Sequence, residues 1–467
     1  MRKYFSPHNH THYSNLRLLD SINRPEDLID KAIELGLSGI AITDHECLSG
    51  AVKINQYAQK IKESHPDFTI ALGNEIYLTD TRDRGQKYYH FLLIAKDEIG
   101  HRALRELSSI AWYNSYQDRG ERVPTLKKDL TEIVNKYKGH LIATSACMGG
   151  ELSTNALLMA EAESVNDIRN ATIFYQNICN FIEYCIKLFG DDFYIECAPS
   201  TNSEQLIVNK KLYNIAKAYD IKMVVGTDSH YLRPEDRPVH KAYLNSKDGD
   251  REVDSFYEYA YLMTAGEVTD LLLKCYSQEA VDKILDNTLD MESKIKSYSL
   301  FHKQGIPTVE IPDYPKNNFW GVNNPIADDM ESYPTLKKLF TSDDKFDRYW
   351  VNQCWDKLNE LEHGYDQGDD VYLAQLEEEA RVKQIIGEKL ETNMFRYPVT
   401  LQHYIDMIWD CGSMVGAGRG SSCAALNHYL LGVTQLDPIE WDLPFFRYLN
   451  DERVELGSLI LILPSCK

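Results

Sequence analysis

Short apolar segments alternate with helical segments through the first two-thirds of this sequence. The clearest expected strands are 40–43, 141–145, 193–197 and 223–227, and expected helices include 25–36 and 51–63. Strands and helices that alternate at this spacing form βα units, which assemble into a parallel sheet or barrel. We therefore predict a barrel-like α/β domain over residues 1–285. In such folds the chemistry takes place where the C-terminal ends of the strands meet.

Beyond residue 285 the alternation of apolar and helical segments ends. Pro307, Pro312, Pro315 and Pro325 interrupt an extended stretch, and a helical period follows over residues 376–390. A length of 467 residues also exceeds what one hydrophobic core usually serves. We expect a second domain over residues 286–456 and a separate tail over residues 457–467.

Charge and cysteine usage restrict the class of protein. Lys and Arg number 50 against 71 Asp and Glu, a net charge of −21, which disfavours a protein that coats DNA through a basic surface. A local phosphate site remains compatible with this charge, because metal ions or a few side chains can supply positive charge. The 10 cysteines include no CxxC pair and are scattered, as is typical of reduced thiols.

Neither a leader nor a membrane span is evident. The N-terminus lacks an apolar segment, and the late apolar run 459–463 is far shorter than the ~20 residues that a membrane span needs. We therefore expect a cytoplasmic protein with no membrane partner.

Residues that can bind metals recur where the expected strands end. His8 and His10 alternate after the first candidate strand, so both imidazoles could project from one face. The others follow or begin later apolar segments: His45, Glu75, His90, Cys147, Asp228 and His230. If these segments are barrel strands, all of these side chains reach one mouth.

Each of these residues alone has an ordinary interpretation. A lone histidine is usually packed or solvated, a lone cysteine is usually a small buried hydrophobe, and a lone glutamate is usually solvated. Their joint placement favours a metal site, and imidazole with carboxylate and thiolate suits Zn, Mn or Fe. Asp44, beside His45, is expected to orient an imidazole without binding the metal.

Several motifs resemble a known family. They are His8-Asn9-His10-Thr11, Thr43-Asp44-His45, Gly73-Asn74-Glu75, Tyr89-His90-Phe91, Cys147-Met148-Gly149-Gly150-Glu151 and Thr227-Asp228-Ser229-His230-Tyr231. They are similar to the successive motifs of the polymerase and histidinol phosphatase (PHP) domain, in the version that opens the alpha subunit of bacterial DNA polymerase III. The resemblance runs from residue 8 to about residue 456.

The resemblance implies a distorted (β/α)7 barrel with a trinuclear metal cluster. Carried over by motif position, nine ligands are expected: His8, His10, Asp20, His45, Glu75, His90, Cys147, Asp228 and His230. The segment before Asp20 is longer than is usual in the family. A full ligand set is compatible with metal-assisted phosphoester hydrolysis, as a 3′–5′ exonuclease or a pyrophosphatase, or with a metal site that only stabilises the polymerase.

A glycine-rich loop lies in the second domain, at residues 416–422. Glycines let the backbone approach phosphate oxygens, serine hydroxyls can donate to them, and Arg419 could add a bidentate donor. A plain turn is the ordinary interpretation of such a loop. The residues that follow it resemble the palm of these polymerases, where the loop binds the triphosphate of the incoming nucleotide. The residues carried over are Gly418, Arg419, Gly420, Ser421 and Ser422.

The sequence departs from the family after Val454. The family continues into a Pro-Asp-x-Asp-x-Asp segment whose aspartates bind Mg²⁺, whereas no carboxylate follows Glu455 here. We therefore expect an interrupted gene, of a kind frequent in phages, and no DNA synthesis by this chain alone. A complementary C-terminal polypeptide would complete a partial α+β palm. Primer-template DNA and dNTP would then be substrates, and a sliding clamp and other replisome proteins would bind the missing regions.

Three hypotheses remain open. The chain is the N-terminal part of a replicative DNA polymerase, a stand-alone metal-dependent phosphoesterase, or a metal-stabilised module of a split polymerase.

Overall fold

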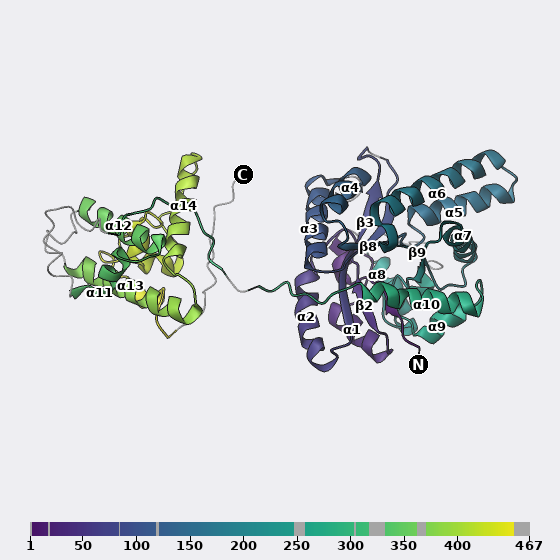
Figure 1. The fold of residues 1–467 in the computed structure, drawn as a ribbon, viewed down its shortest axis with the longest axis horizontal. Coiled ribbons are helices and arrows are strands. Elements are labelled where there is room, and N and C mark those ends of the chain that lie inside the picture. The colour runs from purple at the N-terminus through teal and green to yellow at the C-terminus, as the bar shows by residue number, and fades with distance from the viewer. Residues whose placement is uncertain are drawn as a thin grey trace. The chain divides into compact units, whose positions relative to one another are not determined.

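The computed structural model divides into two compact units, Met1–Phe301 and His302–Lys467, shown as ribbons in Figure 1. It describes residues 2–16, 19–83, 85–117, 121–246, 257–302, 305–316, 332–361 and 370–452. The expected tail, residues 457–467, lies outside these ranges.

A single curved sheet forms the centre of the first unit. Its strands are β1 (Phe5–Ser6), β2 (Gly39–Ile42), β3 (Thr69–Thr79), β4 (Tyr89–Ala95), β8 (Leu141–Thr144), β9 (Phe193–Cys197) and β10 (Met223–Val225), paired in this order. A further strand, β7 (Pro124–Leu126), pairs with β3. A parallel bridge between Asn9 and Ser229 connects the two ends of the sheet. The sheet is thus a nearly closed barrel, and the predicted fold class is confirmed.

One strand departs from the parallel arrangement. β4 runs antiparallel to both β3 and β8, whereas the other pairs along the barrel are parallel. The reason is local, because residues 80–88 join β3 to β4 without a crossover helix, and only an antiparallel pair can be joined so directly. As a result, His90 near the start of β4 lies at the same end of the barrel as residues that follow the parallel strands.

Helices surround the barrel (Figure 1). They are α1 (Pro25–Glu34), α2 (Ala51–Ser64), α3 (Glu98–Tyr113), α4 (Lys127–Lys136), α5 (Glu151–Ser164), α6 (Ile168–Phe189), α7 (Ser203–Tyr219), α8 (Arg237–Leu244), α9 (Ala265–Leu272) and α10 (Gln278–Ser293). The strands alternate between two cores, as Ile40 and Ile42 belong to the large core and Ala41 belongs to a smaller one with Tyr194. This alternation explains why the apolar strands carry few polar residues before their ends.

In the described residues of the second unit, all regular secondary structure is helical. Its helices are α11 (Pro334–Phe340), α12 (Lys345–Glu360), α13 (Asp370–Leu390), α14 (Arg396–Asp410) and α15 (Leu426–Leu430). Trp350 of α12 and Leu376 of α13 are fully buried in the core between these helices. The expected helix over residues 376–390 is part of α13. Strands of the expected α+β palm are not found among the described residues of this unit.

Within the described part of the chain, none of the helices is both long enough and apolar enough to cross a membrane.

Candidate metal centre

Two histidines enter the barrel mouth from the loop after β1. His8 and His10 are fully buried, and their Nε2 atoms lie 3.0 Å apart. The Nδ1 atom of His8 lies 2.6 Å from the Glu196 carboxylate, and the Nδ1 atom of His10 lies 3.1 Å from Ser14 Oγ. Because Ser14 Oγ donates its own proton to Asp44, it accepts from His10. These contacts place a proton on each Nδ1 atom, and both Nε2 atoms face the interior of the mouth.

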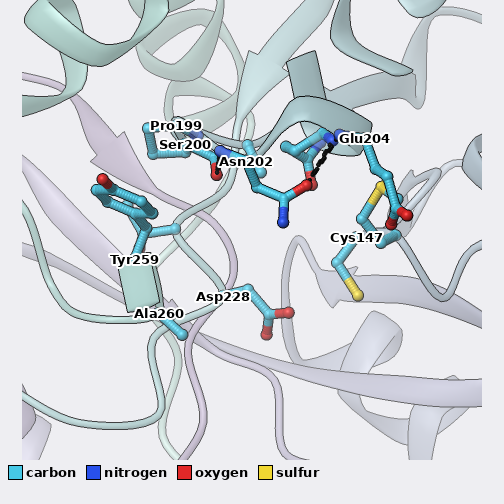
Figure 2. A pocket seen from close by; sticks show the side chains of 12 residues that line it. Cys147, Pro199, Ser200, Asn202, Glu204, Asp228, Tyr259 and Ala260 are labelled. Carbon is cyan, nitrogen blue, oxygen red and sulfur yellow. Dashed lines mark hydrogen bonds between the residues drawn. The ribbon is translucent and has the colours of Figure 1, made fainter. Parts of the chain in front are cut away.

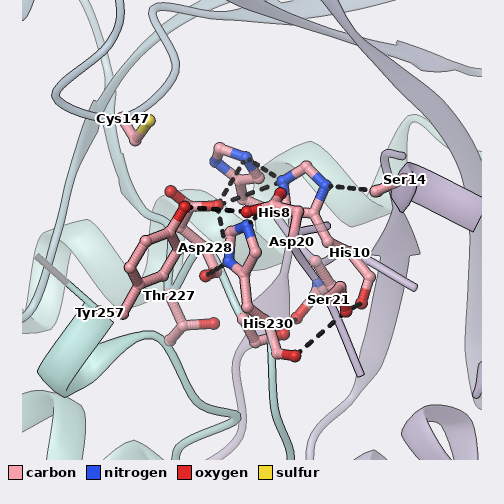
Figure 3. Close-up of polar contacts among 12 residues, drawn as sticks. His8, His10, Ser14, Asp20, Ser21, Cys147, Thr227, Asp228, His230 and Tyr257 are labelled. Carbon is pink, nitrogen blue, oxygen red and sulfur yellow. Dashed lines mark hydrogen bonds and ion pairs between the residues drawn. The ribbon is translucent and has the colours of Figure 1, made fainter. Parts of the chain in front are cut away.

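Asp20 contacts two further histidines, His45 and His230, which come from two other loops. Its Oδ2 atom lies 2.7 Å from His45 Nε2 and 2.8 Å from His230 Nε2. Its Oδ1 atom accepts a hydrogen bond of 2.8 Å from the Tyr257 hydroxyl. His230 Nδ1 lies 2.7 Å from the main-chain carbonyl of Asp228, so Nε2 is the nitrogen that faces the cluster. Figure 3 shows Asp20, His230 and Tyr257 converging from separate segments.

Glu75 lies at the centre of the histidines. Its side chain is fully buried inside β3, four residues before that strand ends. His45 Nδ1 lies 2.8 Å from Glu75 Oε2, and His90 Nδ1 lies 3.0 Å from Glu75 Oε1. His8 and His10 also approach Glu75, at 3.4 and 3.3 Å. One carboxylate thus faces four imidazoles.

The remaining two predicted residues lie beside this group. Asp228 Oδ1 is 3.2 Å from both His8 Nε2 and His10 Nε2, and the backbone of Asp228 has a φ of 46°, in the left-handed region. Cys147 is at the edge of the cluster, with Sγ 3.6 Å from His90 Nδ1 (Figure 3). The structure therefore brings all nine sequence-predicted residues together, although they are spread over more than 200 positions.

The donor set fits divalent cations. Glu75 Oε2 and Asp228 Oδ1 are buried and accept no hydrogen bond from the residues that the structure describes, although imidazole nitrogens lie close to both. Three groups of donors each lie within 4.8 Å: His10, His45 and His230; His8, His10 and Glu75; and His45, Glu75 and His90. Buried acceptors without hydrogen bonds are costly unless a cation neutralises them. Imidazole, carboxylate and thiolate are the ligands of Zn, Mn and Fe sites.

The charges of the cluster depend on one another. Burial favours the neutral form of Asp228, but His8 and His230 hold the pKa of this carboxyl below its usual value. Burial likewise opposes ionisation of Glu75, and His90 and His8 hold its pKa well below the ordinary range. Burial first, and then Asp228 and Glu75, raise the pKa of the Cys147 thiol. Metal binding at such a site requires deprotonated ligands, so it releases protons.

The Asp44 prediction needs a refinement. Among the described histidines, none contacts Asp44 directly through a ring nitrogen. Asp44 instead accepts hydrogen bonds from Thr11 and from Ser14, which in turn contacts His10. The orienting effect that we expected therefore acts through the Ser14 hydroxyl.

The sequence analysis missed Glu196. This carboxylate is buried, contacts His8 Nδ1 and accepts a hydrogen bond of 2.6 Å from Thr144 Oγ1. A β-carbon added at Gly226 would overlap the Glu196 carboxylate, so only glycine fits there. The available signal was an acidic residue in the otherwise apolar strand 193–197, two positions after Tyr194, which faces the small core.

The glycine-rich loop of the second unit is exposed, and hydrogen bonds to its main-chain carbonyls fix its conformation. Gly418 has a φ of 142°, and a β-carbon there would collide with Cys423. Gln435 N donates to Ala417 O at 2.7 Å, and Ser422 Oγ donates to Arg419 O at 2.8 Å. The helix that follows, α15, has only five residues, so its dipole is small. The groups that the loop presents to a phosphate are therefore its exposed backbone and Arg419.

Comparison with protein families defines the class of the first unit. Residues 6–200 match the family model described as "PHP domain", and residues 348–458 match the one described as "Bacterial DNA polymerase III alpha NTPase domain". The barrel with its histidine-rich mouth is thus a PHP domain, and the chain continues into a DNA polymerase III alpha domain.

Whole-chain comparisons agree with this pairing of domains. A DNA-directed DNA polymerase of Bacillus phage SPbeta is 39% identical over 97% of this chain and 36% of its own length. The DNA polymerase III subunit alpha of Borreliella burgdorferi is 28% identical over 96% of this chain and 34% of its own length. The chain is therefore similar to replicative DNA polymerase III alpha subunits, and it spans about a third of the length of the curated relatives it matches.

Among solved structures, histidinol phosphate phosphatase from Lactococcus lactis, complexed with Zn, L-histidinol and phosphate, covers 53% of this chain and 95% of its own. Its identity is 11% and its TM-score is 0.27, an overlap too slight to bear on function.

Proposed function

We propose that the PHP domain binds divalent metal ions at the barrel mouth and hydrolyses phosphoesters, acting as a 3′–5′ exonuclease in a replicative DNA polymerase. The observation that carries this proposal is the pair of buried carboxylate oxygens, Glu75 Oε2 and Asp228 Oδ1, that accept no hydrogen bond while facing imidazole nitrogens. Such an arrangement is costly without a cation and is stabilised by one.

Nine side chains would hold a trinuclear cluster of Zn, Mn or Fe: His8, His10, Asp20, His45, Glu75, His90, Cys147, Asp228 and His230. When bound, such ions lower the pKa of a water and neutralise charge on a phosphate. The chain's own contribution is orientation. Glu196, Ser14 and the Asp228 carbonyl keep protons on Nδ1 of His8, His10 and His230, so that each Nε2 lone pair faces the cluster.

The reaction would be hydrolysis. The bond between phosphorus and the ester oxygen breaks as the water oxygen bonds to phosphorus, and the alcohol leaves with one proton from that water.

For the second unit, we propose that the loop Gly418, Arg419, Gly420, Ser421 and Ser422 binds the triphosphate of a dNTP in the complete polymerase, with Mg²⁺. Exposed backbone at two glycines with positive φ and an exposed arginine support this role. Polymerisation of primer-template DNA would also need aspartates, and no carboxylate follows Glu455 in these 467 residues. We expect no primer extension by this polypeptide alone with Mg²⁺, and robust synthesis would contradict that.

The phosphoesterase proposal is tested by metal content and nuclease activity together. The natively purified chain should contain Zn, Mn or Fe by elemental analysis and should degrade single-stranded 3′ ends in a chelator-sensitive reaction. A variant with His10→Ala and Asp228→Ala should lose both properties, whereas His65→Ala, at an exposed position, should keep both. Bound metal without hydrolysis would favour a metal site that only stabilises the polymerase, and absence of metal would contradict the proposal.

A further inference from the structure

A small cavity lies directly beside the metal centre, at the barrel mouth (Figure 2). Its volume is about 90 Å³, and it is lined by Cys147 and Asp228 of the metal centre together with the loop after β9 and the segment around Tyr259. A phosphate held at the centre would therefore have one of its substituents in this cavity. Four of its lining residues, Cys147, Met148, Thr227 and Asp228, belong to the motifs quoted above, and the other eight belong to none of them.

The lining of the cavity is unsuited to a second phosphate. None of its twelve residues is Lys or Arg, and two of them, Glu204 and Asp228, carry carboxylates. A polyphosphate group would meet these carboxylates without a compensating cation from the protein. An uncharged polar group meets no such penalty.

An aromatic side chain and a hydroxyl form one wall of the cavity. The Tyr259 hydroxyl hydrogen-bonds to Thr201 Oγ1 at 2.8 Å, which holds the ring in place. The Ser200 hydroxyl accepts a hydrogen bond of 2.9 Å from the Asn202 backbone. An aromatic face beside polar groups suits a sugar-like alcohol, which has both apolar and hydroxyl surfaces.

Asn202 points its amide nitrogen into the cavity (Figure 2). Its Oδ1 atom caps α7 by accepting from Glu204 N at 2.9 Å and from Gln205 N at 3.3 Å. This cap fixes the orientation of the amide, so Nδ2 faces the space in front of Asp228. No acceptor for Nδ2 is found among the residues that the structure describes. A fixed donor of this kind is ready to bind an oxygen of a ligand.

We propose that this cavity binds the uncharged, sugar-like alcohol of the phosphoester and that Asn202 Nδ2 donates a hydrogen bond to it. The inference rests on the proposed phosphoesterase function and narrows its substrate class. The site selects a phosphate carried by a nucleoside over a phosphate carried by another phosphate. A terminal nucleotide is therefore a substrate, and pyrophosphate is not.

Equilibrium binding tests this inference without turnover. Calorimetry of the full chain with Mn²⁺ measures the affinities of thymidine 5′-monophosphate, inorganic phosphate and pyrophosphate. We expect the nucleotide to bind about tenfold more tightly than inorganic phosphate, as one well-placed hydrogen bond to a fixed donor allows. Pyrophosphate should bind no more tightly than inorganic phosphate.

Two substitutions test the Nδ2 donor of Asn202 separately from the helix cap that its Oδ1 atom forms. Asn202→Asp and Asn202→Ser both keep an oxygen that can cap α7, and both remove the Nδ2 donor. Both should retain the wild-type melting temperature and lose most of the tenfold preference for the nucleotide. Asn202→Ser should also retain the affinity for inorganic phosphate, whereas the added carboxylate of Asn202→Asp weakens the binding of every phosphate ligand. The matched control, Asn180→Asp on the exposed face of α6, should keep that preference.

The outcomes are distinct. An unchanged preference in both Asn202 variants, or pyrophosphate binding as tight as that of the nucleotide, would overturn this inference alone. If the metal-loaded wild-type chain binds no inorganic phosphate, the proposed function fails and the inference fails with it.

Discussion

Each unit of this chain buries a glutamate completely, and the two glutamates are satisfied in opposite ways. In the second unit, Glu379 accepts hydrogen bonds from Leu426 N at 2.6 Å, from Asn427 N at 2.9 Å and from two side-chain amides. In the first unit, Glu75 faces imidazole nitrogens, and its Oε2 atom accepts no hydrogen bond. Burial by itself therefore does not identify a functional carboxylate.

The difference lies in what completes each site. Backbone amides of the protein itself stabilise the Glu379 carboxylate. Because these amides open α15, Glu379 caps that helix and so supports the glycine-rich loop that precedes it. Glu75, by contrast, faces imidazole nitrogens, and these are groups that also bind cations. We conclude that the first cluster is built for an external ligand and the second for stability, and the following predictions test this contrast.

Metal binding should have the largest effect, and only on the first unit. An ion at a thousand times its dissociation constant adds about 4 kcal/mol of stability, which corresponds to roughly 10 °C in melting temperature for a unit of this size. Differential scanning calorimetry with Zn²⁺ or Mn²⁺, before and after a chelator, measures this shift. The variant with His10→Ala and Asp228→Ala should lose it, and equal melting with and without metal in the wild type would contradict the contrast.

Removing the satisfied carboxylate should destabilise the second unit without any metal. Glu379→Ala leaves Leu426 N and Asn427 N without their acceptor in a buried place, which costs about 3–5 kcal/mol. Urea unfolding followed by tryptophan fluorescence measures this loss, since Trp350 and Trp355 lie in that core. The neighbouring exposed residue supplies the control, because Glu378→Ala should change stability by no more than about 0.5 kcal/mol.

The second unit also contains an unmatched cation, Lys383. Its Nζ atom is buried, has no hydrogen-bond partner within the described part of the chain, and lies 5.6 Å from the ring centres of both Phe445 and Tyr448. Burial lowers its pKa from 10.5 to about 8, although Glu379 acts in the opposite direction. Because the folded state binds its proton more weakly than the unfolded state does, this lysine destabilises the fold below pH 8.

Lys383→Met should therefore stabilise the second unit at pH 7 by roughly 3 kcal/mol. The gain should shrink as pH rises from about 8 towards 10.5, because the folded wild-type chain then releases a proton that the unfolded chain still holds, and the cost of that release falls to zero near pH 10.5. Urea unfolding at pH 7 and at pH 10 measures the difference. Exposed Lys389→Met is the matched control, and a gain that is the same at both pH values would refute the assignment.

The smallest expected effect comes from Glu196, which is not one of the nine expected ligands and contacts His8. Glu196→Gln weakens the hold on His8 Nδ1–H and should raise the metal dissociation constant by about 10- to 100-fold, while the fold stays intact. Competition with a fluorescent chelator measures the constant. Exposed Glu183→Gln should leave it unchanged, and a shift below threefold in Glu196→Gln would show that Glu196 does not orient the site.

Local pattern was enough to predict much of the first unit. The strand over Phe193–Cys197 and the helix that begins at Ala51 were expected within a residue or so, because alternating apolar residues and turn signals act over short distances. Eight of the nine candidate ligands were predicted from their types and places relative to strands, and the family resemblance added Asp20. Glu196 was missed because its role depends on a contact with His8, 188 positions away.

What the sequence by itself determined is the kind of donors present and the ends of strands that carry them. Only the tertiary structure decided that these donors meet: β4 reverses its direction and places His90 at the mouth, and the bridge between Asn9 and Ser229 brings the two ends of the barrel together. Likewise, only the tertiary structure shows that Glu75 faces imidazole nitrogens, whereas Glu379 faces backbone amides. The physical reason is that the energy of a buried charge depends on the groups that surround it, and those groups come from distant parts of the chain.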